Sequence, residues 1–135
     1  MSELMVLGKA GLASQPFSKL LGVELIQLTA GNAEFKLAIR NELKQQNGFV
    51  HGGVIGTLAD NGLAFVAGTA LGINIVTSEY KINFVRPATG EYLLARSSVL
   101  SSGSKQAVCD CKVFSVSDGL ETLVAIAQGT ISKGS

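Results

Sequence analysis

Tryptophan is absent from the sequence, histidine occurs once, and charged residues make up only 16% of the 135 positions. A typical globular protein has about 25% charged residues, and the formal net charge here is only +1. Such a weak electrostatic field attracts neither the phosphate backbone of a nucleic acid nor an anionic membrane surface. We therefore expect no nucleic-acid partner and no membrane partner.

Cysteine is scarce as well, and the positions of its two copies exclude two common uses. Cys109 and Cys111 lie two positions apart in a strand-like segment, so their side chains point the same way, which is poor geometry for a disulfide. The single histidine, His51, lies elsewhere in the sequence and cannot complete a zinc site with them. The pattern predicts reduced core cysteines, no metal and a cytoplasmic location.

Aromatic residues contribute 6% of the chain, whereas apolar residues of all kinds contribute 47%. A chain this apolar and this poor in charge predicts aliphatic surface buried against a second copy, so we expect a homodimer or a homotetramer. The length fits a single domain, residues 1–135, and is too short for two ordinary ones.

The longest apolar stretch, residues 53–70, is nearly long enough to cross a membrane. Asp60 and Asn61 lie at its centre, however, and we expect a buried helix of a soluble protein instead. Glycines in a helix lower its stability, and close contact with a sheet would offset that loss. This contact is the expected reason for four glycines, Gly53, Gly56, Gly62 and Gly68.

The remaining sequence alternates between strand patterns and turn residues. A short helix is expected at residues 15–21, with strands at 23–28 and 34–40 before the long helix, and at 74–85, 91–101, 106–117 and 121–132 after it. In the segment 74–85, alternation places Tyr80 on one face and Thr77 on the other. Short links predict an antiparallel meander, and the fold class is α+β: a curved antiparallel sheet of five to six strands wrapped around one long helix.

Asp60 is the first candidate functional residue. It lies in the middle of the apolar helix, and no lysine or arginine is found three or four positions away on either side. An unpaired ionised carboxylate in an apolar setting costs several kcal/mol, so fold stability alone gives little reason for an aspartate here. A carboxylate that reacts in a cleft is one interpretation, and an aspartate that faces solvent or an interface is the other.

His51, Gly52 and Gly53 lie where a loop leads into the long helix. The first N–H groups of a helix have no internal partners and carry a partial positive charge, so small residues there let a carbonyl oxygen or an oxyanion approach. The three residues outline an oxyanion hole. His51 would otherwise be a structural hydrogen-bonding residue, as single histidines often are.

The distance between these candidates predicts how they are used. Asp60 follows Gly52 and Gly53 by seven to eight residues, which at about 1.5 Å per residue is roughly 11 to 12 Å. One carbonyl group cannot touch both ends of that distance. If both act on one substrate, the helix start comes from a second subunit whose helix runs antiparallel, which puts the site at a two-fold interface.

Three features together resemble a known family: the triplet HGG at His51, the aspartate nine residues after that histidine, and the segment TSEYKINFVRPATG at residues 77–90. They are similar to the hotdog-fold acyl-CoA thioesterases, in particular the 4-hydroxybenzoyl-CoA and phenylacetic-acid-degradation (PaaI-like) group, over about residues 22–132. The resemblance implies the hotdog fold, a dimer or tetramer, and hydrolysis of an acyl-CoA or related thioester to free acid and thiol. It implies no cofactor and no metal, because a carboxylate, a helix dipole and water suffice for a thioester.

The resemblance also implies roles for individual residues. Asp60 corresponds to the acidic residue that acts as nucleophile or as general base for water, and Gly52 to the residue whose N–H polarises the thioester carbonyl. Gln45 corresponds to a side chain that holds the thioester or the water, and Thr77 to a hydroxyl that orients the water. His51 corresponds to a histidine that organises the loop.

Other positions are candidates for substrate binding. Gly53 lies beside Gly52 at the helix start. Gly103, Ser104 and Lys105 correspond to a turn where members of the resembled family often contact the nucleotide end of coenzyme A. Arg86 is a second basic candidate, and ordinary surface charge is the alternative for both cations.

Two other functions stay open at this point. One is a noncatalytic module that binds or senses acyl-CoA, and the other is a hydratase or dehydratase of an acyl thioester, in which His51 would touch an acid. The sequence leaves open the acyl group, coenzyme A against a carrier protein, nucleophile against general base for Asp60, and dimer against tetramer.

Overall fold

The computed structural model describes residues 1–134. Helices α1 (Glu3–Ala13) and α2 (Pro16–Leu21) precede strands β1 (Glu24–Thr29) and β2 (Asn32–Ala38) and the short 3-10 helix η1 (Asn41–Leu43). The long helix α3 (Gly52–Leu71) follows, and after it come β3 (Ile75–Phe84), β4 (Tyr92–Ser102), β5 (Gln106–Ser117) and β6 (Leu120–Lys133). Every predicted helix and strand is present within a few residues of its expected bounds.

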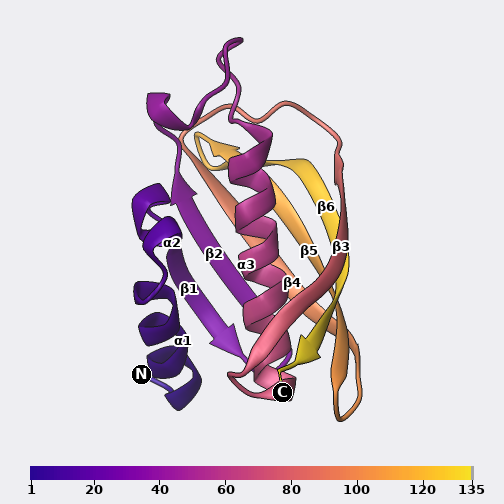
Figure 1. Cartoon of the computed structure of the whole chain (residues 1–135). Coiled ribbons are helices and arrows are strands. Elements are labelled where there is room, and N and C mark those ends of the chain that lie inside the picture. The colour runs from indigo at the N-terminus through magenta and orange to yellow at the C-terminus, as the bar shows by residue number, and fades with distance from the viewer. Residues whose placement is uncertain (135) are drawn as a thin grey trace.

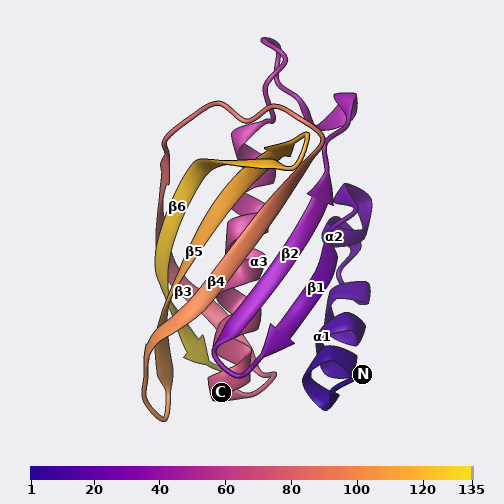
Figure 2. The same cartoon turned by 180° about the vertical axis from the view of Figure 1, so that it is seen from behind.

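Helix α3 lies against one face of a six-stranded antiparallel sheet that curves around it (Figure 1). The view from behind shows the strands in front of the helix (Figure 2). Leu58, Leu63 and Val66 of α3 are fully buried, as are Phe35 and Leu93 of the sheet. By length and composition alone α3 could cross a membrane, but 56% of its apolar stretch is buried inside the fold, as in a core helix. The predicted α+β class, a curved sheet wrapped around one helix, is confirmed.

The order of the strands differs from a simple meander. The sheet runs β1-β2-β4-β5-β6-β3, so that β4, β5 and β6 form the expected meander while β3 pairs with β6 at the edge. The connection between β3 and β4, residues 85–91, contains Pro87 and Gly90 and passes near the start of α3 instead of forming a hairpin (Figure 1). It is longer than the two to five residues usual in a hairpin loop. The expectation that β3 neighbours β4 is therefore wrong.

The glycines of α3 do not share one explanation. A Cβ at Gly62 would lie only 2.9 Å from Cys111 Sγ, so the helix approaches β5 closely there, as predicted. The nearest sheet atoms to a Cβ at the other three positions are at ordinary contact distance or absent. For these three the expected close contact with the sheet is wrong, because they line open grooves; they are Gly53, Gly56 and Gly68.

Gly62→Ala is expected to destabilise the fold by about 1 to 3 kcal/mol, because the added methyl overpacks the contact with Cys111 and Ser97. Gly11→Ala in α1 is the matched control, since nothing lies within 4 Å of a Cβ there and alanine favours a helix by about 1 kcal/mol over glycine. Urea denaturation at equal m-values measures both. A Gly62→Ala protein as stable as the wild type would contradict the close packing of α3 on β5.

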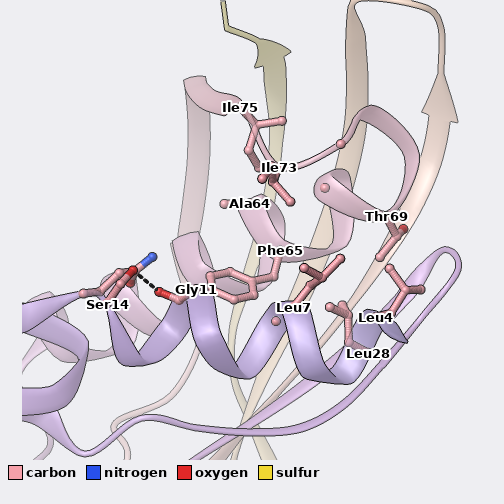
Figure 3. Close-up of a pocket in the computed structure, with 14 residues that line it drawn as sticks. Leu4, Leu7, Gly11, Ser14, Leu28, Ala64, Phe65, Thr69, Ile73 and Ile75 are labelled. Carbon is pink, nitrogen blue, oxygen red and sulfur yellow. Dashed lines mark hydrogen bonds between the residues drawn. The ribbon is translucent and has the colours of Figure 1, made fainter. Parts of the chain in front are cut away.

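Helix α1 is an element that the sequence analysis does not predict. Its N-terminus is capped by the Ser2 side chain, which accepts a hydrogen bond from the Met5 N–H. Gly8 lets α1 pack on β1, since a Cβ there would lie 2.7 to 2.8 Å from Leu25 and Leu28. Between α1 and the C-terminal half of α3 lies an apolar pocket of about 470 Å³, here called the α1 pocket (Figure 3).

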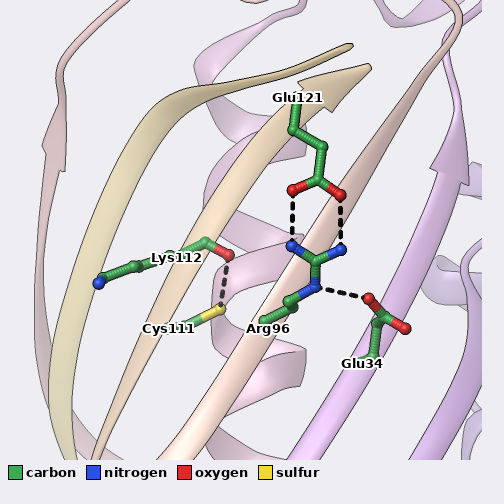
Figure 4. A network of polar contacts seen from close by, with 5 residues as sticks. All are labelled: Glu34, Arg96, Cys111, Lys112 and Glu121. Atoms are coloured by element: carbon green, nitrogen blue, oxygen red, sulfur yellow. Dashed lines mark hydrogen bonds and ion pairs between the residues drawn. The ribbon is translucent and has the colours of Figure 1, made fainter. Parts of the chain in front are cut away.

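The outer face of the sheet is polar. Arg96 of β4 makes ion pairs with Glu34 of β2 at 2.7 Å and with Glu121 of β6 at 2.6 Å (Figure 4). Hydrogen bonding to Arg96 lowers the pKa of the Glu121 carboxyl. Exposed ion pairs of this kind contribute about 1 kcal/mol or less each.

The inner face contains the two cysteines, which are free and buried, as predicted. Burial raises the pKa of Cys109 to about 11 and that of Cys111 to about 12, and the charge of Asp110 adds to both shifts. Both side chains are therefore thiols at neutral pH.

Candidate active site

The loop before α3 projects beyond the body of the sheet (Figure 1). An isolated bridge between Lys44 and Val50 closes its base, and Gly48 has a φ of +88° at its tip. Inside the loop, the Gln45 side-chain oxygen accepts a hydrogen bond from the Asn47 N–H. The loop is thus ordered by its own hydrogen bonds up to the first residue of the helix.

His51 is the N-cap of α3. Its Nδ1 accepts a hydrogen bond from the Gly53 N–H at 2.8 Å, which means that Nδ1 carries no proton and the ring is neutral in this arrangement. The bond also occupies one of the two amides that the sequence analysis expects to face a substrate. Within residues 1–134, His51 makes no hydrogen bond to a carboxylate, the contact that a hydratase would need.

Gly52 supplies the amide that stays open. Its N–H donates no hydrogen bond within residues 1–134, and it lies in the first turn of α3, where the helix dipole is positive. A Cβ on Gly52 would lie 3.5 Å from the Phe84 ring, so this ring borders the start of the helix. The Gly52 N–H can donate a hydrogen bond to an oxyanion. The Gly53 N–H instead donates to the capping His51 side chain.

Asp60 lies in the middle of α3, about two turns from its start, and is partly exposed. The Thr77 hydroxyl of β3 donates a hydrogen bond to Asp60 Oδ1 at 2.9 Å. This contact brings together two candidate residues that lie 17 positions apart in the sequence. The second carboxylate oxygen accepts no hydrogen bond within residues 1–134, so it is free to meet a substrate or a water.

A β-bulge places Thr77 on the face that holds Asp60. The pairing of β3 with β6 shifts between Thr77 and Glu79, so the extra residue Ser78 interrupts the alternation. Thr77 and Tyr80 consequently both face α3, and the expectation that they lie on opposite faces is wrong. Strict period-two alternation cannot anticipate a bulge, and Ser78 carries no sequence signal for one.

Tyr80 is a site residue that the sequence analysis did not select. Its hydroxyl lies over Gly56, one helical turn before Asp60, where a Cβ on Gly56 would be 3.6 Å away. Burial, and after it the negative charge of Asp60, raise the pKa of Tyr80. The hydroxyl is therefore protonated at neutral pH and can donate a hydrogen bond. Gly129 of β6 makes room for it, since a Cβ there would lie 2.6 Å from Tyr80 Cβ.

Gly52, Asp60 and Tyr80 line one groove of about 680 Å³, here called the Asp60 groove. It runs along α3 from Gly52 to Ala64 between α2 and β3. The Gly52 amide and the Asp60 carboxylate lie eight residues apart, or about 12 Å along the helix. Both residues line the same groove, but they are too far apart to hold one carbonyl group.

Helix α2 forms one wall of this groove. The sequence predicts the helix but not its position next to Asp60. Asn61, next to Asp60, donates a hydrogen bond to the Ser18 hydroxyl at 3.2 Å, and Ser18 donates in turn to the Gln15 side-chain oxygen at 2.7 Å. Asn61 and Ser18 are both buried. This chain of hydrogen bonds ties α2 to α3, and no pattern in the sequence links residues so far apart.

Gln45 and Arg86 lie in a second, smaller groove of about 370 Å³, which adjoins the first at Gly52 and Phe84. Arg86 Nη1 also donates to the Leu123 carbonyl oxygen at 3.1 Å. The structure therefore brings Gln45 and Arg86 to the Gly52 end of the site and away from Asp60.

Gly103, Ser104 and Lys105 form the turn between β4 and β5. The Gly103 N–H donates to the Gln106 carbonyl oxygen at 2.8 Å and closes that turn. In Figure 1 this hairpin lies at the end of the sheet opposite the start of α3. Within one chain, Lys105 is thus far from both Gly52 and Arg86. No group of three or more His, Cys, Asp or Glu side chains suited to a metal lies within residues 1–134.

The thioesterase superfamily model matches residues 47–122, which include the second half of the loop, α3, β3, β4, β5 and the start of β6. A candidate esterase of Saccharolobus solfataricus is 30% identical over 111 residues, which cover 82% of this chain and 72% of the relative. The chain belongs to the thioesterase superfamily, and its general activity is that of a thioester hydrolase.

Solved structures agree with this assignment. A thioesterase family protein from Silicibacter pomeroyi superposes with a TM-score of 0.92 at 27% identity, covering 97% of this chain and 98% of that one. A variant of the phenylacetic acid degradation protein PaaI from Thermus thermophilus gives a TM-score of 0.78 at 27% identity, covering 88% and 99%. PaaI from E. coli, at 22% identity and a TM-score of 0.85, shares the fold over 98% and 94%. The resemblance to the PaaI-like group of hotdog thioesterases is confirmed.

Proposed function

We propose that the protein hydrolyses acyl-CoA thioesters to the free acid and coenzyme A, with Asp60 as the reacting carboxylate. The observation that carries this proposal is the hydrogen bond from Thr77 to Asp60 Oδ1 at 2.9 Å, in a groove whose other end is the open Gly52 amide. A thioester carbonyl is electrophilic enough to react with a carboxylate or a carboxylate-activated water without a metal.

The hydrogen bond from Thr77 fixes the Asp60 carboxylate and leaves its second oxygen available. That oxygen either attacks the thioester carbonyl carbon itself or removes a proton from an attacking water. In both cases negative charge develops on the carbonyl oxygen, and a helix N–H such as that of Gly52 stabilises it. Tyr80, protonated beside Asp60, is placed to donate a hydrogen bond to the substrate or to the water.

The Gly52 amide and the Asp60 carboxylate that act together come, in this proposal, from two subunits of a dimer. The edge strand β3 supports this, because within residues 1–134 it pairs only with β6 and its other edge is open. Large apolar side chains beside that edge are exposed, among them Val76 at 58% and Phe84 at 54%. An antiparallel two-fold across β3 would bring the start of one α3 toward Asp60 of the other.

The same two-fold axis would allow both basic candidates, Arg86 and Lys105, to contact coenzyme A. Arg86 lies near Gly52 in its own chain, and the β4–β5 turn with Lys105 lies at the opposite end. Reversing one subunit against the other would bring the turn of the second subunit toward the Gly52 end of the first. Coenzyme A would then extend from the thioester toward Arg86 of one subunit and Lys105 of the other.

A thiol-release assay over a panel of acyl-CoAs tests the proposed function. The panel contains short, long and aromatic acyl groups, together with a crotonyl-CoA reaction followed by its enoyl absorbance. Release of free thiol with at least one acyl-CoA supports hydrolysis. Hydration of the double bond without thiol release, or tight binding of acyl-CoA without any turnover, would overturn the proposal.

Lys105→Ala is expected to raise KM for acyl-CoA by about two- to fivefold with little change in kcat, as for one exposed contact to a phosphate. The increase should shrink at high salt, since exposed charges are screened. Acyl-pantetheine, which lacks the nucleotide, is the control substrate and should show no difference between the two proteins. An unchanged KM for acyl-CoA would mean that Lys105 is an ordinary surface charge without a role in substrate binding.

A further inference from the structure

The α1 pocket adjoins the Asp60 groove. Gln15 and Ala64 line both of them, so these two residues mark the junction of the two spaces. Ala64 lies one helical turn beyond Asp60, at about 6 Å along the axis, and its side chain is a single methyl group. From there the α1 pocket follows α3 to Gly72, which is about 12 Å further.

The lining of the α1 pocket is apolar in practice. None of the 14 residues that line it carries a charge. The two hydroxyl groups in the lining already donate hydrogen bonds. Ser14 donates to the Gly11 carbonyl oxygen at 2.7 Å, and Thr69 donates to the Val66 carbonyl oxygen at 2.7 Å. Only the Gln15 amide, at the junction, keeps a free N–H donor beside its bond to Ser18.

Gly11 is explained by this pocket and by nothing else in the fold. It lies in the last turn of α1, and glycine is a weaker helix former than alanine. Gly8, one turn earlier, is required by its contacts with Leu25 and Leu28, but a Cβ on Gly11 would meet nothing within 4 Å. Gly11 is one of the α1 residues that line the pocket (Figure 3), so its missing side chain leaves volume in the pocket.

We propose that the α1 pocket holds the acyl group of the substrate, and that helix α1 thereby sets the acyl preference of the enzyme. This inference rests on the proposed function, because it takes the thioester carbonyl to lie at Asp60. A thioester held there has two substituents: the coenzyme A part extends toward the basic side chains Arg86 and Lys105, and the acyl part enters the α1 pocket beside α3. The acyl group is uncharged and apolar, aliphatic or aryl, because the pocket offers a carboxylate no cation.

The test compares kcat/KM across straight-chain acyl-CoAs for the wild type, Gly11→Leu and Ala10→Leu. Ala10 is exposed on α1 and lies outside the pocket, so Ala10→Leu adds the same bulk to the same helix without filling it. For the wild type, kcat/KM is expected to rise up to about fourfold for each methylene until the pocket is full. Succinyl-CoA, of the same length as butanoyl-CoA but charged, should be at least about a hundredfold poorer.

Gly11→Leu is expected to shift the optimum to shorter chains and to lower the ratio of decanoyl-CoA to butanoyl-CoA turnover by at least about tenfold, while Ala10→Leu keeps the wild-type ratio. Thermal unfolding of all three proteins controls for the fold. Equal ratios in the three proteins would overturn the inference, and so would a wild-type kcat/KM independent of chain length. Thiol release in either case would leave the proposed function standing.

Two further results separate the alternatives. If Gly11→Leu alone changes the oligomeric state measured by light scattering, the pocket receives a neighbouring subunit and the inference is wrong. If no acyl-CoA releases thiol, the proposed function fails. Binding of decanoate, measured by calorimetry, then tests separately whether the pocket holds an acyl chain. Weaker decanoate binding to Gly11→Leu than to Ala10→Leu would support an acyl pocket, and equal binding would overturn it.

Discussion

Asp60→Asn is expected to lower kcat for acyl-CoA hydrolysis by at least about a hundredfold while leaving KM nearly unchanged. Asparagine has almost the shape of aspartate and can still accept the hydrogen bond that Thr77 donates at 2.9 Å. It cannot ionise, however, and so it can neither attack a carbonyl carbon nor remove a proton from water. Steady-state kinetics with thiol detection measures the loss, and circular dichroism checks the fold.

Thr77→Val is the companion variant, because it removes the hydroxyl that fixes Asp60 but leaves the carboxylate in place. Its effect on kcat should be smaller than that of Asp60→Asn, about tenfold, as for a lost orienting hydrogen bond. Thr77→Ser keeps the hydroxyl and should recover most of the activity. A folded Asp60→Asn protein with most of its activity would exclude the proposed chemistry.

Single-turnover hydrolysis in oxygen-18 water tests whether Asp60 acts as the nucleophile, which is one of the two roles left open for it. A nucleophilic carboxylate forms an anhydride with the acyl group, and water that attacks the Asp60 carbon of that anhydride leaves its oxygen in the side chain. A general base never exchanges oxygen. Peptide mass spectrometry of residues around Asp60 after one turnover reads the result directly.

Local pattern was sufficient to predict the central part of this fold from the sequence. A long apolar stretch that ends at a glycine predicts α3, and alternation predicts the strands, because both patterns lie within single elements. Asp60 stood out because a carboxylate in such a helix has no local partner. The candidate oxyanion donors followed from the position of two glycines at the helix start, and only the structure shows that His51 occupies the second amide.

What the sequence could not predict depends on contacts between distant elements. The bulge at Ser78, which turns Thr77 and Tyr80 to the same side, depends on the pairing of β3 with β6. That pairing was itself mispredicted, because chain proximity favours consecutive strands. Helix α1 was missed because its two glycines weaken the helical pattern, although one of them fits β1 and the other leaves room in a pocket.

A dimer in which each site uses Gly52 of one subunit and Asp60 of the other has a consequence that a single-chain site lacks. The two residues lie about 12 Å apart along one helix, so neither subunit can complete a site alone. Gly52→Val adds a branched side chain next to the amide, with a Cβ that would lie 3.5 Å from the Phe84 ring, and it is expected to lower kcat/KM by at least about a hundredfold. Together with Asp60→Asn it gives two inactive proteins with lesions at opposite ends of the site.

Mixing these two inactive variants and allowing their subunits to exchange is expected to restore activity. A heterodimer then contains one site with both lesions and one site with neither. Random exchange of equal amounts makes half of the dimers mixed, so about a quarter of wild-type activity should return. Asp60→Asn mixed with the double variant Asp60→Asn, Gly52→Val is the control, since no pairing of its subunits yields an intact site. If native mass spectrometry finds the heterodimers and activity stays at the level of that control, both residues act within one chain, and the substrate must then bridge the groove in another way.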